Sequence, residues 1–477
     1  MIFPKGSILY VFFLIFSLIS VFVAYHKQIA LETTIIYFSG FLVLIIAYNQ
    51  QEVLSSRYKQ FVLFASVVYS FTFISTLFFP VELVGKGTSL MRYFGHSQIG
   101  NLFLTPFFLF PSGVIGIISL FFIIISYSRA TYLAVLAIAW VIYKNKFTKK
   151  GFLIKAVLAV LTVSLILSTT FKVISENGSL LGLRDKYFAD AVSGVIDRPF
   201  FGAGPGNYRY ISASKQVGYS EGAGSSHNLI LDIFSQNGIL AGLFFILFLT
   251  YVLKKGKRNV FFYSFLALSV VFLFDHTFEY NSFLFLWFFL VGLSLDTKDS
   301  IEFNPLVFFG VFLLLQLVFI GKIFHVTGNY TQALFFYPLQ EKSHYYAITN
   351  EIKRGNMSQA RDYLNIYEKL YGENFEATYR MAKYYERIRE WKKSLKLYRK
   401  SLELRPFLSV TDGIILEKIH NLSRKTLGYF KGDKETEIFF GRIKAKAQKM
   451  SSYNEVIGIH IDEYCNATNL LCYNVEH

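Results

Sequence analysis

The segment RDKYFADAVSGVIDRPFFGAGPGNYRY spans residues 184–210, and the segment GSSHNLILDIFSQNG spans residues 224–238. They belong to a polar, glycine-rich stretch between two long apolar blocks. Apolar runs of about twenty residues recur on either side, which is the length that a membrane-spanning helix needs. The pattern predicts a membrane protein in which this stretch gathers arginine, glycine and histidine at the membrane surface.

The composition supports this class of protein. The chain has 477 residues, of which 53% are hydrophobic, and its length allows two domains. Its mean hydropathy of +0.40 is too apolar for an ordinary soluble protein. The net charge of +16 does not indicate a nucleic-acid partner, because much of the basic charge lies beside apolar runs, where it sets membrane topology.

The apolar runs predict an all-α polytopic protein with about eleven transmembrane helices. The division of the pair around 111–112 stays open. The first run is long and lacks a small-residue cleavage site, so we expect a retained anchor. We expect helices at 7–25, 29–48, 60–79, 97–111, 113–127, 129–143, 152–171, 229–253, 260–275, 280–295 and 304–324.

Basic residues predict the orientation of these helices. Lysines and arginines cluster in the loops 144–150 and 254–258, and we place Arg57 and Lys59 in a third loop. Counting helices puts all three loops on one side together with Lys5, and the positive-inside rule makes that side the cytoplasm. The loops 81–96 and 172–228 and the tail from 325 onward then face outward.

We divide the chain into a membrane domain, 1–324, and a C-terminal domain, 325–477. In the tail, Ala360 and Ser394 are 34 residues apart, as are Leu364 and Tyr398. This spacing predicts a helical domain like tetratricopeptide repeats, and a plain amphipathic helical domain remains the alternative. Cys465 and Cys472 form either a small disulfide loop or two free thiols.

Three arginines are candidate ligands for phosphate. Arg129 lies between two apolar runs, where a charge is costly; it either binds phosphate oxygens or anchors the chain at the interface. Arg184 and Arg198 lie in the outward loop. Converging arginines beside a membrane suit a lipid-linked diphosphate, because they neutralise charge on the leaving group.

His227 is the candidate general base, because a neutral imidazole at the membrane surface can accept a proton from a hydroxyl. A structural histidine is the alternative. His276, in the group Asp275, His276 and Glu279, is a weaker candidate. Gly202 and Gly204 do not fit a dinucleotide fingerprint, so we expect a structural turn there. We find no metal-ligand spacing, nucleophilic serine or cysteine motif, or phosphate-binding loop in the sequence.

Several of these elements, in this order, resemble the O-antigen ligase / Wzy polymerase superfamily. SRA at 128–130 resembles the family's Ser-Arg-Gly turn, with Ala130 in place of Gly, and MRYFGHSQIGN at 91–101 resembles a further Arg–Gly–Asn element. Arg184 lies where the family carries an arginine. The remaining matches are Pro199, Gly202, Gly204, His227, Asn228, Gly238 and Gly242. The resemblance spans residues 90–295.

The resemblance implies a metal-independent, inverting glycosyltransferase of GT-C type that needs no cofactor. It would sit in the bacterial inner membrane, with its C-terminal domain in the periplasm, and transfer a glycan from undecaprenyl diphosphate to an acceptor hydroxyl. By carry-over, His227 activates that hydroxyl, and Arg129 and Arg184 hold the diphosphate. Accessory roles fall to Arg92, Arg198, Asn228 and His276.

The acceptor stays open among lipid A–core, a glycan and a protein. The activity therefore stays open among an O-antigen ligase, a Wzy-type polysaccharide polymerase and a protein O-oligosaccharyltransferase. The alternative of another class is a non-enzymatic polytopic scaffold or glycolipid transporter. In either case we expect contact with membrane lipid and a protein partner recruited through the tail.

Overall fold

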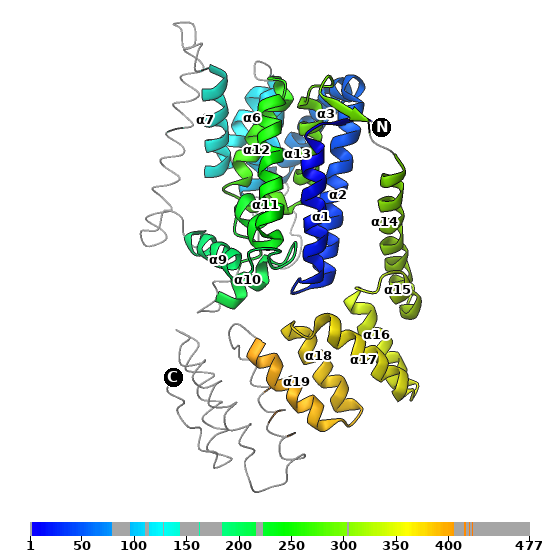
Figure 1. The fold of residues 1–477 in the computed structure, drawn as a ribbon. Helices are drawn as coiled ribbons and strands as arrows, with labels where there is room; N and C mark the ends of the chain where they lie inside the picture. Colours follow the sequence, from blue (N-terminus) through cyan, green and yellow to red (C-terminus); the bar gives the residue numbers. More distant parts are fainter. Residues whose placement is uncertain are drawn as a thin grey trace.

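The computed structural model describes residues 2–78, 96–109, 114–126, 128–143, 184–215, 223–302 and 305–404, with single positions at 162, 415, 419 and 422. The protein is mostly helical, which confirms the all-α prediction (Figure 1). The expected helix at 152–171 lies outside the described residues, except for position 162. The long helices of the N-terminal part are α1 (Ser7–Phe22), α2 (Lys27–Asn49), α3 (Gln51–Phe78), α5 (His96–Leu109), α6 (Val114–Ile125), α7 (Arg129–Tyr143), α11 (Leu229–Lys255), α12 (Val260–Phe272), α13 (Asn281–Ser294) and α14 (Pro305–Val326).

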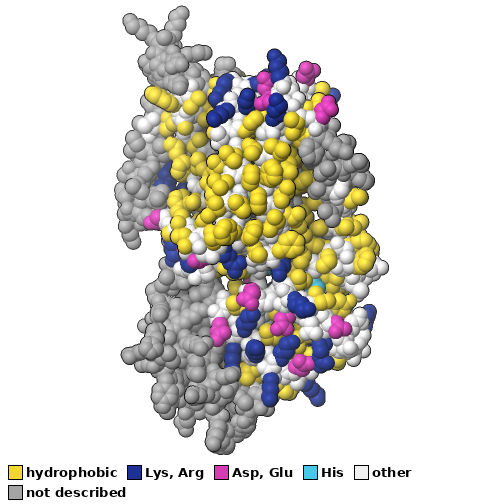
Figure 2. Space-filling model, in the orientation of Figure 1, with side chains coloured by type: hydrophobic (Ala, Val, Ile, Leu, Met, Phe, Trp, Pro, Cys, Tyr) yellow, Lys and Arg dark blue, Asp and Glu magenta, His cyan; other side chains and the backbone are white. Residues whose placement is uncertain are grey.

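These helices form a bundle with an aromatic core and an apolar outer surface. Tyr10 of α1 lies at the centre, its ring 5.3 Å from Phe41 and 5.2 Å from Phe288. Figure 2 shows a broad hydrophobic belt with charged side chains above and below it. Among the described residues, α2 and α11 are each long and apolar enough to cross a membrane, and α1, α12 and α13 are shorter apolar helices. The number of spans stays a prediction.

Helix α3 begins nine residues before the predicted helix at 60–79. Arg57 and Lys59 therefore lie on exposed turns of α3, and the prediction of a loop there is wrong. Residues 51–59 contain no proline or glycine, and their polar side chains are compatible with a helix that continues beyond the apolar run.

One end of the bundle carries a small β-ribbon that the sequence analysis did not predict. Strand β1 (Ile2–Pro4) pairs antiparallel with β2 (Ser300–Glu302). The carboxylate of Asp299, beside the ribbon, forms ion pairs with Lys5 at 3.2 Å and with Lys255 at 3.7 Å. The ribbon thus ties the N-terminus, the end of α11 and the α13–α14 connection together at the lysine-rich end.

At the other end, a turn between α9 (Arg184–Asp197) and α10 (Tyr208–Lys215) packs on a break in α11. Gly238 has φ 85° and ψ 172°, which interrupts the helix. The amides of Ala203 and Gly204 donate to the carbonyls of Ser235 and Gln236, at 3.0 and 2.8 Å. The turn therefore satisfies carbonyl groups that a regular helix would have paired internally.

The C-terminal part consists of α15 (Tyr330–Phe336), α16 (Glu341–Lys353), α17 (Met357–Tyr371), α18 (Phe375–Arg387) and α19 (Trp391–Leu404). Helix α16 packs on α17 and α18 packs on α19, while α15 contacts α14 and α16. Ala360 and Leu364 on α17, and Ser394 and Tyr398 on α19, are all buried. The assignment to a particular repeat family stays a prediction. Cys465 and Cys472 lie outside the described residues.

Candidate active site

His227 lies immediately before α11, at the end of the bundle opposite the β-ribbon. Asn228 caps the helix: its side-chain oxygen accepts from the amides of Ile230 and Leu231, each at 3.0 Å. The Asn228 amide also donates to the carbonyl of Leu273, at 3.0 Å, and so fixes the cap against the end of α12. His227 has φ 59°, a left-handed conformation that turns its ring away from the helix.

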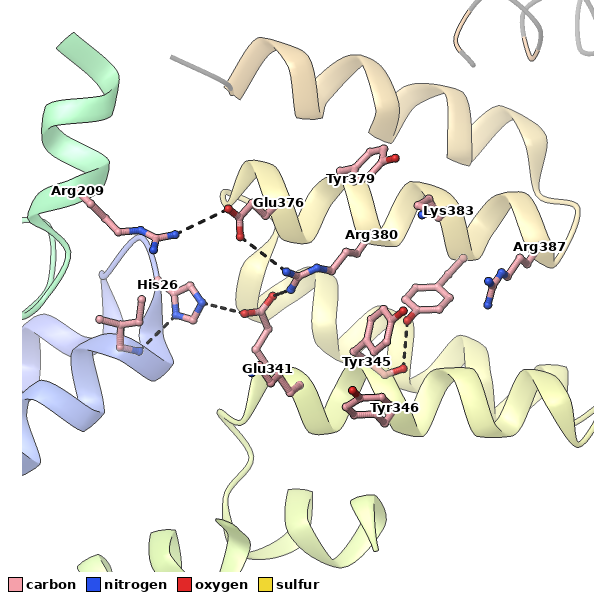
Figure 3. A pocket seen from close by; sticks show the side chains of 13 residues that line it. His26, Arg209, Glu341, Tyr345, Tyr346, Glu376, Tyr379, Arg380, Lys383 and Arg387 are labelled. Carbon is pink, nitrogen blue, oxygen red and sulfur yellow. Dashed lines mark hydrogen bonds and ion pairs between the residues drawn. The ribbon is translucent and has the colours of Figure 1, made fainter. Parts of the chain in front are cut away.

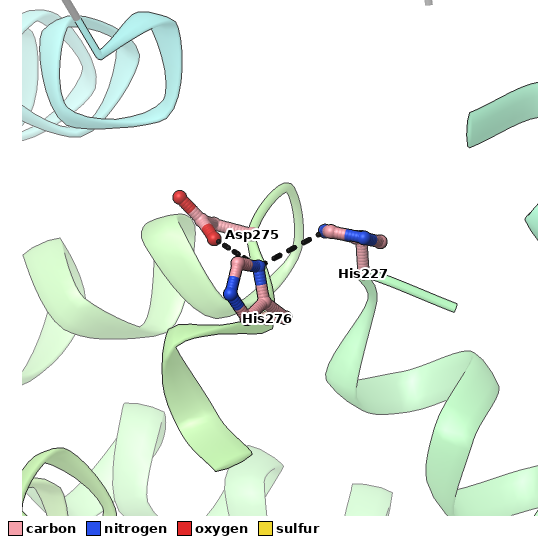
Figure 4. A group of neighbouring side chains, drawn as sticks. All are labelled: His227, Asp275 and His276. Atoms are coloured by element: carbon pink, nitrogen blue, oxygen red, sulfur yellow. Dashed lines mark hydrogen bonds and ion pairs between the residues drawn. The ribbon is translucent and has the colours of Figure 1, made fainter. Parts of the chain in front are cut away.

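The His227 ring meets side chains from two other elements. Tyr187 of α9 stacks on it, with ring centroids 5.6 Å apart. His276, in the short helix η3 (His276–Glu279), approaches edge-on at 4.8 Å. The Nδ1 atoms of the two histidines are 3.3 Å apart, and His276 Nδ1 is 3.0 Å from Oδ1 of Asp275 (Figure 4). The three side chains form one connected group.

The electrostatics of this group favour a charged His276. The hydrogen bond with Asp275 raises the pKa of His276 above the ordinary value, against the opposing effects of burial and of Arg184. Burial would raise the pKa of Asp275, but His276 and Arg184 outweigh it and hold that pKa below the ordinary value. His227 also contributes to the lowered pKa of Asp275, so the carboxylate interacts electrostatically with both imidazoles.

Arg184 begins α9, one turn before Tyr187, and its charge acts on both Asp275 and His276. Because α9 packs against α11, the packing brings Arg184 and His227 into one region, although 43 residues separate them in the sequence. Two of the residues selected from the sequence therefore lie in the same site.

Arg129 is the first residue of α7, and a buried hydrogen-bond chain connects that helix end to η3. Thr131 donates to the side-chain oxygen of Asn101, and the Asn101 amide donates to the hydroxyl of Thr277, both at 2.8 Å. Thr277 follows His276 directly. The chain fixes the start of α7 against the element that carries His276.

Arg198 is placed elsewhere. Its guanidinium donates to the carbonyl of Val23 at 3.0 Å and lies 3.9 Å above the Tyr25 ring, so it binds the turn between α1 and α2. Arg92 lies outside the described residues, as does most of the loop that holds it.

Gly202 and Gly204 lie in the turn against α11, with φ of 64° and 95°. A Cβ on Gly202 would lie 2.4 Å from the backbone carbon of Gln236, and one on Gly204 would lie 2.2 Å from Cβ of Ala24. These contacts explain the requirement for glycine without any bound ligand.

A cavity of about 180 Å³ lies beside the start of α11, which follows His227, and beside η3, which carries His276. It lies between α2, α11 and α13, and its walls include Gly224, three residues before His227, and Glu279 of η3. Burial raises the pKa of Glu279, and the charge of His276 opposes that effect. Neither His227 nor His276 is among the residues that line this cavity.

His227, Asp275 and His276 also have the composition of a metal site, with ligand atoms within 4.8 Å of one another. Two imidazoles and a carboxylate are a common ligand set for a divalent cation. Arg184 opposes such a cation, because its positive charge acts on Asp275 and His276. The hydrogen bond between Asp275 and His276 accounts for the arrangement without a metal.

Sequence reasoning did not select Tyr187, Thr131 or Thr277 as site residues. Tyr187 carried a signal, because it lies three residues after Arg184 and so shares a helix face with it. No sequence pattern marks Thr131 or Thr277 as a site residue. They are connected only because tertiary packing places Asn101 between them.

Residues 114–246 match the family model described as O-antigen ligase. This range contains Arg129, Arg184, the glycine turn and His227, whereas His276 and the C-terminal helices lie beyond it. No curated protein and no solved structure matches the chain. The match covers less than a third of the chain, the region that carries His227, Arg129 and Arg184, and it shows that this region is similar to the O-antigen ligase family.

Proposed function

We propose that the protein transfers a glycan from undecaprenyl diphosphate to an acceptor hydroxyl, with His227 as the general base. The observation that carries the proposal is the convergence of His227, the His276–Asp275 pair and Arg184 at one end of the bundle. An imidazole beside an aspartate–histidine pair and an arginine provides a proton acceptor and stabilisation for a departing anion.

In the proposed reaction, His227 takes the proton of the acceptor hydroxyl. The hydroxyl oxygen attacks the anomeric carbon of the donor, and the bond from that carbon to the diphosphate oxygen breaks. Attack on the face opposite the leaving group inverts the anomeric configuration. Arg184 and Arg129 bind the diphosphate, because a guanidinium presents paired donors that match phosphate oxygens.

We also propose that this end of the bundle faces the periplasm. Lys5, Lys255 and Lys257 gather at the opposite end, where Lys257 lies 3.6 Å from Asp296. A bilayer crossed by α11 would separate the two ends, because the part of α11 after the break at Gly238, residues 239–255, is about 25 Å long. The positive-inside rule then makes the lysine-rich end cytoplasmic.

The test uses His227→Asn and Arg184→Gln in cells and with purified enzyme and undecaprenyl-diphosphate glycan. Asparagine tolerates the left-handed backbone of His227, so the variant tests the imidazole while sparing the fold. We expect transfer to fall about 10²–10⁴-fold without the base and about 10²–10³-fold without the arginine. Arg258→Gln, at the lysine-rich end, is the matched control and should keep full activity.

Unchanged transfer by His227→Asn at normal protein level would show that the proposed base is wrong. Identification of the glycosylated product then separates the three acceptors. Lipid A–core indicates a ligase, a longer lipid-linked glycan indicates a polymerase, and a modified protein indicates an oligosaccharyltransferase.

A further inference from the structure

A cavity of about 660 Å³ lies where the C-terminal helices meet the bundle. Its walls come from the start of α2, from α10, and from α16 and α18 (Figure 3). This volume falls within the roughly 300–1,000 Å³ that is typical of ligand pockets. The cavity is separate from the His227 group, and the proposed reaction assigns it no role.

The cavity is lined by tyrosines that packing holds in place. Tyr345 and Tyr346 of α16 are 37% and 40% exposed, which is high for large rings beside a cavity. Tyr330 stacks on Tyr346, with ring centroids 4.9 Å apart, and Tyr384 packs against Tyr345 at 5.5 Å. Rigid, partly exposed tyrosines offer flat apolar faces with a polar edge, which matches the C–H face and hydroxyl edge of a sugar ring.

The cavity also has an excess of positive charge. Two of its arginines form ion pairs with acidic residues: Arg380 pairs with Glu341, and Arg209 lies 3.9 Å from Glu376. Lys342, Lys383 and Arg387 also line it, and none of them pairs with a carboxylate in the part of the chain that the structure describes. These three cations are available to an anionic ligand.

Lys383 and Arg387 are one helical turn apart on α18, opposite the tyrosines of α16 (Figure 3). The ammonium group of Lys383 lies 5.4 Å from the centre of the Tyr379 ring. A ligand between α16 and α18 would therefore contact aromatic rings and cations from both helices.

The position of the cavity relates it to the proposed reaction. Ile29 of α2 lines both this cavity and the smaller one, whose wall includes Gly224 and Glu279 of η3. A chain-like ligand held in the large cavity would thus lie next to the smaller cavity, which borders η3, the element that carries His276.

We infer that the cavity between α2, α10, α16 and α18 binds an acidic oligosaccharide, a glycan segment that carries carboxylate or phosphate groups. The tyrosines contact its sugar rings, and Lys342, Lys383 and Arg387 bind its anionic groups. This inference rests on the proposed function, because it assumes that the enzyme handles glycans. An acidic peptide offers the same charge without the repeated C–H ring faces that the tyrosines would contact.

The experiment measures binding to the purified full-length protein in lipid nanodiscs. The probes are a linear oligogalacturonate, a maltooligosaccharide of equal length, an oligoglutamate peptide of equal charge and inorganic phosphate. The test variant is Lys383→Gln/Arg387→Gln. The matched control is Lys392→Gln/Lys396→Gln, which removes the same charge at the same spacing from exposed positions on α19 that do not line the cavity. Tyr346→Ala and Tyr346→Phe separate the ring from its hydroxyl.

We expect the oligogalacturonate to bind more tightly than the maltooligosaccharide. The cavity variant should raise its Kd about tenfold or more, because charge-assisted hydrogen bonds are lost. The control variant should leave Kd unchanged. Tyr346→Ala should weaken binding, whereas Tyr346→Phe should retain it.

Equal loss of binding in the cavity and control variants would overturn the inference. So would tighter binding of the oligoglutamate than of the oligogalacturonate, or displacement of the oligogalacturonate by inorganic phosphate at equal concentration. His227→Asn keeps the two proposals distinguishable, because it should abolish transfer and leave binding intact. If His227→Asn is inactive and the cavity variant binds normally, the further inference alone fails.

Discussion

At the scale of single residues, the His227–His276–Asp275 group is held together by contacts among its own side chains and with the residues around it. Asp275 is 2% exposed, so its carboxylate depends on a hydrogen-bond partner, and His276 supplies one. The position of His227, the proposed base, is also set by its neighbours. The Asn228 helix cap holds the adjoining backbone, and Tyr187 stacks on the imidazole ring.

The pH dependence of stability should reveal the Asp275–His276 pair. Because the folded pKa of His276 is raised, its contribution is fully present below about pH 6.5, the ordinary histidine pKa, and is lost as pH rises through the raised value. Asp275 has a lowered pKa, so its contribution is lost as pH falls below about 4. Thermal unfolding of the wild type and Asp275→Asn should differ most between these limits; a constant difference from pH 4 to pH 9 would contradict the assignment.

Chelation tests whether His227, Asp275 and His276 bind a divalent cation that the reaction needs. We expect transfer by the purified enzyme to be unchanged after dialysis against a strong chelator, because Arg184 opposes a cation at this position. Metal analysis of the dialysed enzyme is the control. Loss of activity that returns with one divalent metal, and fails to return in His276→Ala, would show that the group is a metal centre.

At the scale of elements, the break in α11 and the glycine turn depend on each other. A Cβ on Gly238 would lie 2.1 Å from the carbonyl oxygen of Phe200, and its φ of 85° is strained for other residues. We expect Gly238→Ala to destabilise the protein by more than the roughly 1–3 kcal/mol of backbone strain. Gly328→Ala is the control, because Gly328 has φ 81° and no atom within 4 Å, so it carries strain without a clash. Equal losses of thermal stability in the two variants would contradict the packing argument.

The hydrogen-bond chain through Asn101 connects α5, α7 and η3. Asn101→Leu leaves the hydroxyls of Thr131 and Thr277 buried without their partner, at a cost of about 1–3 kcal/mol. We expect lower transfer activity as well, since η3 carries His276. Thermal unfolding and transfer assays on Asn101→Leu check this, and the additional changes Thr131→Val and Thr277→Val should recover part of the stability. Full activity in Asn101→Leu would show that η3 does not need this chain.

At the scale of the whole molecule, Glu341 joins the bundle to the C-terminal helices. Its carboxylate lies 3.0 Å from Nε2 of His26 and also receives Arg380 and Tyr367. Burial raises the pKa of Glu341, but His26 and Arg380 outweigh it and lower the net value. The contact therefore persists at neutral pH and weakens as pH falls through the lowered pKa.

Glu341→Ala should loosen the C-terminal helices while the bundle stays folded. Removing one partner of a buried ion pair costs about 3–5 kcal/mol, and the partial exposure of Arg380 places the loss at the low end. Hydrogen exchange should rise in α16 and around His26, with little change in α11. Lys400→Ala, whose partner Glu373 is exposed, is the control. Unchanged exchange in α16 would show that other contacts hold the C-terminal helices to the bundle.

The sequence by itself determined the helical class, the places of most helices, and the choice of His227, Arg129 and Arg184. Apolar length and the 34-residue spacing are local patterns, which a linear sequence records directly. Only the tertiary structure decided that His276 and Asp275 meet His227, that Arg198 binds the turn after α1, and that α3 extends back over Arg57. These outcomes depend on how helix ends pack and on how far a helix continues beyond its apolar run, and no local pattern encodes either.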